Sequence, residues 1–249
     1  MLRDRNDPDQ VWRCCAYWPR SLINKWNARE FAARHGADLP ALFWRGTASE
    51  EAPFESLPDA FVIRPVSGTM CRGVEAVVGD RELLHGHPAS LPELRSGLPR
   101  TRFLRRAAPF LIEEFITTED GRFELPVGYK CHTFGDEVVL VETVRTRSAD
   151  DAEHRYYTPD WEPIEDPINT YLPPDEQLSE PPRCLERMVE QAATLGAELG
   201  TYMRVDFFAS ERGCIFNEFS SLPLGGNYNT PYCEELFGSR WAEKFPDAT

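Results

Sequence analysis

The sequence lacks the features that mark several common classes of protein. It has no excess of basic residues, because its 249 residues carry a formal net charge of −14, whereas nucleic-acid-binding surfaces need basic patches. It has no apolar run near the roughly 18 residues that a membrane-spanning helix needs. Its N-terminus is charged, which predicts no signal peptide. We therefore expect no nucleic-acid partner, no membrane span and a cytoplasmic location.

Metal-binding and disulfide patterns are missing as well. The seven cysteines include no CxxC pair and no Cys/His spacing typical of a zinc site, which predicts reduced thiols. His85 and His87 form an isolated pair, for which we expect no metal role. We find no internal repeat and no low-complexity tract. The composition, with 41% hydrophobic and 27% charged residues, is typical of one large or two small globular domains.

The most informative stretch is a predicted β-hairpin near the C-terminus. Two runs rich in β-branched and aromatic residues flank residues 211–213, which is typical of a three-residue hairpin loop. If Ser210 pairs with Cys214, then Asp206 pairs with Glu218 directly across the ladder. Two carboxylates opposed at about 5 Å repel each other. The pair makes sense if a hard cation such as Mg²⁺ lies between them; the alternative is a solvated polar face with the register shifted by one residue.

The two faces of this hairpin differ in character, because side chains alternate along a strand. The expected core face consists of Val205, Phe207, Ile215 and Phe219. The expected polar face consists of Arg204, Asp206, Glu218 and Ser220.

Helices and strands are predicted along the rest of the chain. A helix is expected at residues 24–35, capped by Asn24 and ended by Gly36. The longest helix is expected at residues 179–199, capped by Ser179 and ended by Gly200. The predicted strands are 39–44, 61–65, 74–78, 109–116, 125–134 and 137–143. Two further segments are a long surface excursion at 148–180 and a short amphipathic tail at 234–245.

Several motifs follow one another in a recognisable order. They are Asn24-Lys25-Trp26, Arg29-Glu30-Phe31, residues 57–63, the glycine loop after Arg64, Glu113-Glu114-Phe115-Ile116, Tyr129-Lys130 and Arg204-Val205-Asp206 with Glu218. In this order they resemble the ATP-grasp fold over about residues 22–230, most closely the short branch associated with teichuronopeptide biosynthesis.

The resemblance implies an α+β protein with two α+β lobes, whose antiparallel sheets hold ATP between them. It implies no full N-terminal pre-grasp domain. The expected domains are a lead-in at 1–22, a smaller lobe with a phosphate flap at 23–112, and a larger lobe with the metal-binding hairpin at 113–249.

The resemblance also implies residues that bind the phosphates of ATP. Lys25 and Arg64 would approach the phosphates, and Arg64 stands where family members usually have lysine. Arginine keeps the charge and offers bidentate geometry. Ser67, Gly68 and Thr69 would form the flap over the β- and γ-phosphates.

The adenine site is implied by the acidic segment that follows. The side chain of Glu113 would accept a hydrogen bond from the adenine amino group. The backbones of Glu114 and Ile116, on either side of Phe115, would contact the edge of the ring.

The hairpin would carry the metal and the catalytic charges. Asp206 and Glu218 would hold Mg²⁺, with Mn²⁺ as an alternative, and Ser220 stands where many relatives have a second-site asparagine, so a second metal stays open. Arg204 would contact the transferred phosphate or the acyl phosphate, and Lys130 would contact phosphate or the carboxylate substrate. With Arg64, these two residues are the expected catalytic groups.

The implied activity is an ADP-forming ligase that joins a carboxylate to an amine through an acyl phosphate, in cell-surface polymer or natural-product biosynthesis. Its acceptor would be a small molecule, a peptide or a polymer end. Either the acceptor site is built from the 148–178 excursion and the 222–230 loop, or the partner is a polymer or another protein. The candidate lining residues are Tyr156, Tyr157, Trp161, Tyr171 and Asn227. Two alternatives stay open: a small-molecule or sugar kinase, and a non-catalytic nucleotide-binding module. The oligomeric state also stays open, with a homodimer as one candidate.

Overall fold

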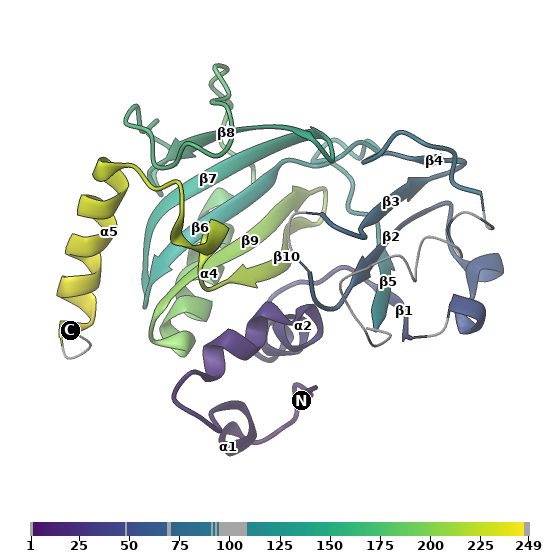
Figure 1. The fold of residues 1–249 in the computed structure, drawn as a ribbon, viewed down its shortest axis with the longest axis horizontal. Coiled ribbons are helices and arrows are strands. Elements are labelled where there is room, and N and C mark those ends of the chain that lie inside the picture. Colours follow the sequence, from purple (N-terminus) through teal and green to yellow (C-terminus); the bar gives the residue numbers. More distant parts are fainter. Residues whose placement is uncertain are drawn as a thin grey trace.

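Two antiparallel sheets organise the part of the chain that the computed structural model describes, namely residues 2–47, 49–68, 71–90, 92, 94 and 109–246. Over these residues each sheet has five strands, and the two sheets lie side by side (Figure 1). The smaller-lobe sheet has the order β1-β5-β2-β3-β4, and the larger-lobe sheet has the order β10-β9-β6-β7-β8. Neither order follows the chain, so residues far apart in the sequence become neighbours.

The smaller-lobe sheet consists of β1 (Leu42–Gly46), β2 (Ala60–Pro65), β3 (Glu75–Val78), β4 (Arg81–Glu82) and β5 (Phe110–Glu114). One face buries an apolar cluster that includes Phe61, Ile63, Val77 and Ile112. The other face carries Ala76 beside Leu84 and Phe115. Short 3-10 turns at Trp18–Ile23, Ser49–Glu51 and Phe54–Ser56 precede β2.

The larger-lobe sheet consists of β6 (Gly128–Phe134), β7 (Glu137–Ser148), β8 (Asp151–Tyr157), β9 (Tyr202–Ser210) and β10 (Gly213–Ser220). Its first face packs against helices α2 (Lys25–Arg34) and α4 (Leu185–Leu199), which together bury the largest apolar core. The second face meets α5 (Pro231–Lys244) through Leu140, Tyr156 and Cys233. In Figure 1, α5 lies at the end of this sheet far from the smaller lobe. Helix α1 (Asp9–Trp12) adds Trp12 to the largest core.

Helix α2 confirms the sequence prediction in both caps. The side chain of Asn24 accepts hydrogen bonds from the backbone N–H groups of Trp26 and Asn27, which are otherwise unpaired at a helix start. Gly36 follows the helix with φ 76°, a conformation that favours glycine. The helix packs against β10 and buries Phe31 in the core of the larger sheet, although its sequence position lies within the 23–112 segment assigned to the smaller lobe.

Helix α4 ends as predicted but begins later. Gly200 has φ 60° and closes its C-terminus. The helix begins at Leu185, with Cys184 rather than Ser179 at the N-cap position, so the predicted cap is wrong. The hydroxyl of Ser179 instead shares a hydrogen bond with Tyr157. Within the described part of the chain, no helix combines the length and hydrophobicity needed to cross a bilayer.

The prediction of an irregular excursion at 148–180 is wrong over its first third. β8 pairs along β7 and adds an edge strand to the larger sheet. The polar composition of Asp151–Tyr157 hides the strand from a search for apolar alternation, and such composition is typical of an edge strand. Bridges from His154 to Pro174 and from Tyr157 to Pro163 then fold the rest of the excursion back onto this strand.

The β9–β10 hairpin reaches the predicted carboxylate pairing by a different route. Gly213 rather than Cys214 pairs with Ser210, so the predicted closing pair is wrong. A bulge between Phe216 and Glu218 then shifts the register by one residue, and Glu218 pairs with Asp206 as predicted. The register difference before the bulge also changes which side chains of β10 face the core.

The core face of the hairpin is corrected accordingly. Phe216 pairs with Phe207 and joins the largest core together with Val205 and Phe219. Ile215 pairs with Phe208 on the opposite face, so its predicted place beside Phe207 is wrong.

Two helical glycines allow a matched test of this packing. A Cβ on Gly196 of α4 would lie 2.2 Å from the carbonyl oxygen of Gly135, whereas a Cβ on Gly238 of α5 meets nothing within 4 Å. We expect Gly196→Ala to lower the free energy of unfolding by about 1–3 kcal/mol, because α4 must move away from the β6–β7 turn. Gly238→Ala should raise it by up to about 1 kcal/mol through helix propensity. Urea unfolding measures both; equal effects of the two substitutions would contradict the packing described for α4.

Candidate active site

A line of polar residues crosses all five strands of the larger sheet. The Cα pairings run from Glu218 on β10 to Asp206 on β9, Lys130 on β6, Glu142 on β7 and Tyr156 on β8. These side chains share the face opposite the α4 core, because Val205 and Val141, their neighbours along the strands, belong to that core. We call this line the polar rung. It places three carboxylates and one ammonium group at successive strands.

The two carboxylates at the β9–β10 end are held by cations. Arg204 donates from Nε and a terminal nitrogen to both oxygens of Asp206, at 2.8 and 2.7 Å. Lys25 Nζ lies 2.9 Å from Glu218 Oε2. Burial raises the pKa of Asp206 above its ordinary value, although Arg204 and Lys130 act against the rise. Burial acts in the same direction on Glu218, but the charge and hydrogen bond of Lys25, then Arg204 and Arg64, lower its pKa.

Lys25 reaches this place because the start of α2 is fixed to the smaller lobe. Its backbone N–H donates to the carbonyl of Val66, just after β2, at 2.8 Å. Its Nζ donates to the carbonyl of Gly68 at 3.0 Å. One lysine therefore joins the glycine loop of the smaller lobe to Glu218 of the larger one.

Arg64 forms a second link between the lobes, through a buried charge cluster. Its Nε donates to Glu113 Oε2 at 2.5 Å, and a terminal nitrogen donates to Asn217 Oδ1 at 2.7 Å. Arg29 donates to the other oxygen of Glu113 at 2.7 Å. Burial lowers the pKa of Arg29, and the charge of Glu113 opposes this. Glu113 thus balances two guanidinium groups, and its predicted bond to adenine stays a prediction.

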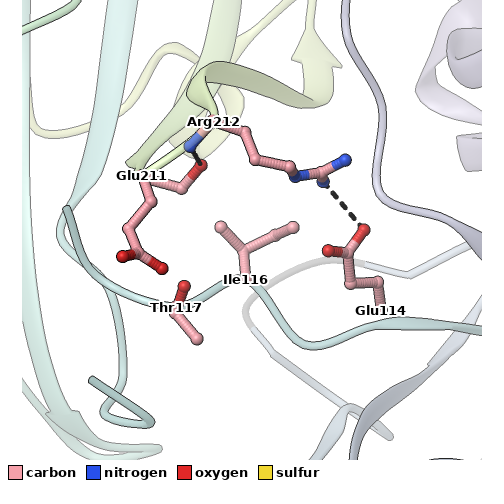
Figure 2. Close-up of a pocket in the computed structure, with 6 residues that line it drawn as sticks. Glu114, Ile116, Thr117, Glu211 and Arg212 are labelled. Atoms are coloured by element: carbon pink, nitrogen blue, oxygen red, sulfur yellow. Dashed lines mark hydrogen bonds and ion pairs between the residues drawn. The ribbon is translucent and has the colours of Figure 1, made fainter. Parts of the chain in front are cut away.

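The side chain of Glu114 points away from Glu113, toward the tip of the β9–β10 hairpin. Its Oε2 accepts from the N–H of Ala41 and from Arg212, both at 2.8 Å. Figure 2 shows Arg212 reaching over Ile116 to Glu114 at a small polar pocket. The backbone of Ile116 makes no hydrogen bond to any other described residue, so it is available to a ligand.

A cleft of about 190 Å³ lies between the two lobes and brings most of the predicted nucleotide residues together. Its apolar part includes Val62, Ala76, Leu84, Leu125 and Phe208. The predicted residues that line it are Lys25, Arg64, Gly68, Glu113, Glu114, Phe115, Ile116 and Glu218.

The remaining predicted residues lie next to the cleft or outside the description. Asp206, Lys130 and Arg204 follow Glu218 along the larger sheet, and Ser220 pairs with Arg204. Ser67 is exposed and does not line the cleft. Thr69 lies outside the described residues.

Sequence reasoning missed several residues of the site. Arg29 lies one helical turn after Lys25, and this spacing of two cations was the available signal. Asn217 contacts Arg64 because it is the extra residue of the bulge, and no local sequence pattern predicts this bulge. Glu142 lies opposite Lys130 only because the register shifts between His132 and Thr133, and the turn at 135–136 alone would place Val141 there.

Glu142 is the centre of a buried network beyond Lys130. Its Oε1 lies 3.1 Å from His154 Nδ1 and accepts from the Tyr156 hydroxyl at 3.3 Å. Burial disfavours its charge, yet Lys130, His132 and His154 hold the pKa of Glu142 well below its ordinary value. The network extends the charged site along the sheet toward α5.

The candidate acceptor residues do not gather in one place. Tyr156 lies in the Glu142 network, whereas Tyr157 stacks on Trp161 with ring centroids 4.2 Å apart, beside Ser179. Tyr171 packs near Tyr228, where the 148–180 excursion meets the 222–230 loop. Asn227 of that loop is exposed and donates to the carbonyl of Leu224.

The expectation of no metal role for His85 and His87 assumed that the two residues are isolated, and this assumption is wrong. His85 and His87 are not isolated, because Glu75 and Glu82 lie beside them in space. The β3–β4 hairpin and the turn after it bring these four side chains together.

Solved structures with similar folds define the class of the protein. A D-alanine–D-alanine ligase from Bacillus anthracis complexed with ATP aligns with TM-score 0.53 and 16% identity, covering 91% of this chain and 64% of its own. The ATP-grasp ligase PsnB, complexed with a phosphomimetic variant of its minimal precursor, Mg and ADP, aligns with TM-score 0.51 and 17% identity. The alignment covers 90% of this chain and 60% of the PsnB chain. A biotin carboxylase complex from Campylobacter jejuni aligns with TM-score 0.58 and 11% identity, covering 90% of this chain and 46% of its own. The chain spans less than two thirds of each of these structures, and the likeness shows the ATP-grasp fold.

The family follows from the sequence itself. The model of the TupA-like ATP-grasp family matches residues 19–240, so the chain belongs to this family. The predicted α+β class and ATP-grasp fold are confirmed. A search of curated protein sequences found no match.

The buried Glu113 cluster yields a paired prediction. Glu113→Gln leaves two buried guanidinium groups without a counter-charge and should lower the free energy of unfolding by about 3–5 kcal/mol. Glu114→Gln removes a contact with Arg212, which is half exposed, and should cost less than about 1 kcal/mol. Urea unfolding of both variants tests this, and a Glu113→Gln protein as stable as Glu114→Gln would contradict the balancing role of Glu113.

Proposed function

We propose that this protein is an ATP- and Mg²⁺-dependent ligase that joins a carboxylate to an amine through an acyl phosphate and releases ADP. The observation that carries the proposal is the pair of opposed carboxylates, Asp206 and Glu218, beside a cleft that also holds Lys25 and Arg64. Free thiols at all seven cysteines support a reducing, cytoplasmic setting.

Each part of ATP has a matching surface in the cleft. The apolar surface near Leu84, Leu125 and Phe208 suits a flat adenine ring, and the free backbone of Ile116 suits its polar edge. The triphosphate would extend toward Lys25 and Arg64, under the loop that contains Gly68. The PsnB structure is a complex with ADP and Mg, which supports the proposal of a nucleotide and a magnesium ion as ligands.

The donor set fits a hard divalent cation. Asp206 and Glu218 offer carboxylate oxygens from neighbouring strands, which Mg²⁺ prefers, and Mn²⁺ accepts the same ligands. Burial raises the pKa of Asp206 and acts in the same direction on Glu218, so a bound cation would help to keep both carboxylates ionised. Bound there with ATP, the metal would neutralise charge on the β- and γ-phosphates.

The protein's own groups would do the rest by position and charge. A carboxylate resists attack by an amine until its oxygen is converted into a phosphate leaving group. Arg204, oriented by Asp206, would contact the phosphoryl group during transfer, and Lys130 would hold the carboxylate substrate between Asp206 and Glu142. Lys25 and Arg64 would offset charge from the smaller-lobe side.

An assay with substrate panels separates this proposal from its alternatives. We expect ADP release that needs both a carboxylate and an amine, since acyl phosphate formation and amine attack complete one cycle. Release with a single hydroxyl acceptor and a stable phosphorylated product would indicate a kinase instead. Tight ATP binding without turnover on any panel would indicate a binding module. Coupled measurement of ADP and product mass distinguishes the three.

Substitution of the carboxylates tests the metal role directly. Asp206→Asn and Glu218→Gln should each lower Mg²⁺-dependent ADP release at least about 100-fold, roughly 3 kcal/mol of transition-state stabilisation. Asp136→Asn, on the exposed β6–β7 turn, is the matched control and should leave the rate unchanged. Thermal unfolding checks that the variants fold. Full activity in both Asp206→Asn and Glu218→Gln would end the proposed metal role.

A further inference from the structure

A second set of possible metal ligands lies on the smaller lobe. Glu75 on β3, Glu82 on β4, and His85 and His87 in the following turn each offer one ligand atom, and all four atoms lie within 4.8 Å of one another. Glu75 pairs with Ile63 of the smaller-lobe core, whereas its neighbour Ala76 lines the ATP cleft. The cluster therefore lies on the opposite side of β3 from the cleft and takes no part in the proposed ligase site.

The spacing of the ligand atoms matches a four-coordinate site. His85 Nδ1 lies 3.2 Å from Glu82 Oε2, and His87 Nε2 lies 3.4 Å from Glu75 Oε2. With metal–ligand bonds of about 2.0–2.1 Å, tetrahedral geometry separates neighbouring ligand atoms by about 3.3–3.4 Å. These two pairs already have this spacing, and the four ligand atoms together lie within 4.8 Å, so the side chains would move closer together to bind an ion.

Glu82 is fixed in place before any ion binds. Its side chain is fully buried. It accepts backbone hydrogen bonds from Ala76, Leu84 and His85. These bonds orient the carboxylate, as second-shell contacts do in metal sites.

Glu75 and His87 leave a place for positive charge between them. Glu75 Oε2 is hidden from solvent and has no hydrogen-bond partner among the described residues. His87 Nδ1 lies 3.0 Å from the carbonyl of Pro88, to which a ring N–H would donate, so Nε2, 3.4 Å from Glu75 Oε2, is the nitrogen placed to bind a metal. A bound cation would offset the charges of both carboxylates together.

The geometry points to a binding site for Zn²⁺, or a divalent transition metal of similar ligand preference, formed by Glu75, Glu82, His85 and His87. Two imidazole nitrogens and two carboxylate oxygens suit Zn²⁺ and disfavour Mg²⁺, which takes oxygen ligands in octahedral geometry. The ion would lock the β3–β4 hairpin and the turn after it. That turn holds Leu84, which lines the ATP cleft and whose carbonyl accepts from Ala149 of the larger lobe at 2.7 Å.

Cobalt titration of the chelator-treated full chain tests the site. In excess Mg²⁺, which keeps the oxygen-ligand site filled, one equivalent of Co²⁺ should produce the intense visible absorption of four-coordinate cobalt. Added Zn²⁺ should abolish it. His87→Gln should weaken Zn²⁺ competition at least about tenfold. Zn²⁺ should also raise the thermal midpoint of the wild-type chain and not that of His87→Gln.

Matched variants separate this site from other ligands in the chain. Asp206→Asn/Glu218→Gln and Cys14→Ser/Cys15→Ser should both keep the cobalt absorption, because they remove the Mg²⁺ ligands and two exposed thiols only. His87 is about two-fifths exposed, so its glutamine variant should fold, and Glu75→Gln is a second ligand variant. Absent absorption, or absorption unchanged in both His87→Gln and Glu75→Gln, would overturn the proposal and leave hydrogen-bonded histidine–glutamate contacts only.

Discussion

Compensation of buried negative charge is the constraint on which the arrangement of this protein depends. The polar rung aligns Glu218, Asp206 and Glu142 on one face of a sheet, and each buried carboxylate needs a cation within reach. Two of the compensating groups, Lys25 and Arg64, come from outside the larger sheet and also hold the loop or strand of the smaller lobe. The same contacts therefore close the cleft and set its electrostatics. A nucleotide with a divalent cation would enter a cleft whose carboxylates are already paired with cationic side chains.

The bulge at the middle of β10 determines which side chains face this cleft. Register errors of one residue in a strand move every side chain to the other face. The extra residue between Phe216 and Glu218 shifts the register by one at this point. As a result, Phe216 joins the core while Glu218 still pairs with Asp206. The extra residue itself, Asn217, presents its side-chain oxygen and its carbonyl to Arg64. One local irregularity thus supplies the pairing of the two carboxylates proposed to bind the metal and a contact between the lobes.

Local features of the sequence were predictable and distant pairings were not. The Asn24 cap, the Gly200 end of α4 and the Asp206–Glu218 pair each depend on residues within one element or one hairpin. The contacts of Glu113 with Arg29 and Arg64 join residues 84 and 49 positions apart, and no periodicity encodes them. β8 was missed because most of its residues are polar and its two tyrosines are adjacent, so no apolar alternation marks the strand. The closing pair of the hairpin was missed because a turn of two residues and a bulge give the same pairing as a turn of three without one.

The arginine at position 64, where lysine is usual, follows from the number of partners that this position must serve. A guanidinium has five N–H donors in a planar fork, whereas an ammonium group is a compact point charge. Arg64 already donates to Glu113 on one side and to Asn217 on the other, in directions set by the fork. A lysine could not span both and still face the cleft. Because Arg64 is committed to these bonds, the more adaptable charge toward a phosphate would come from Lys25, whose partners are the carbonyl of Gly68 and the carboxylate of Glu218.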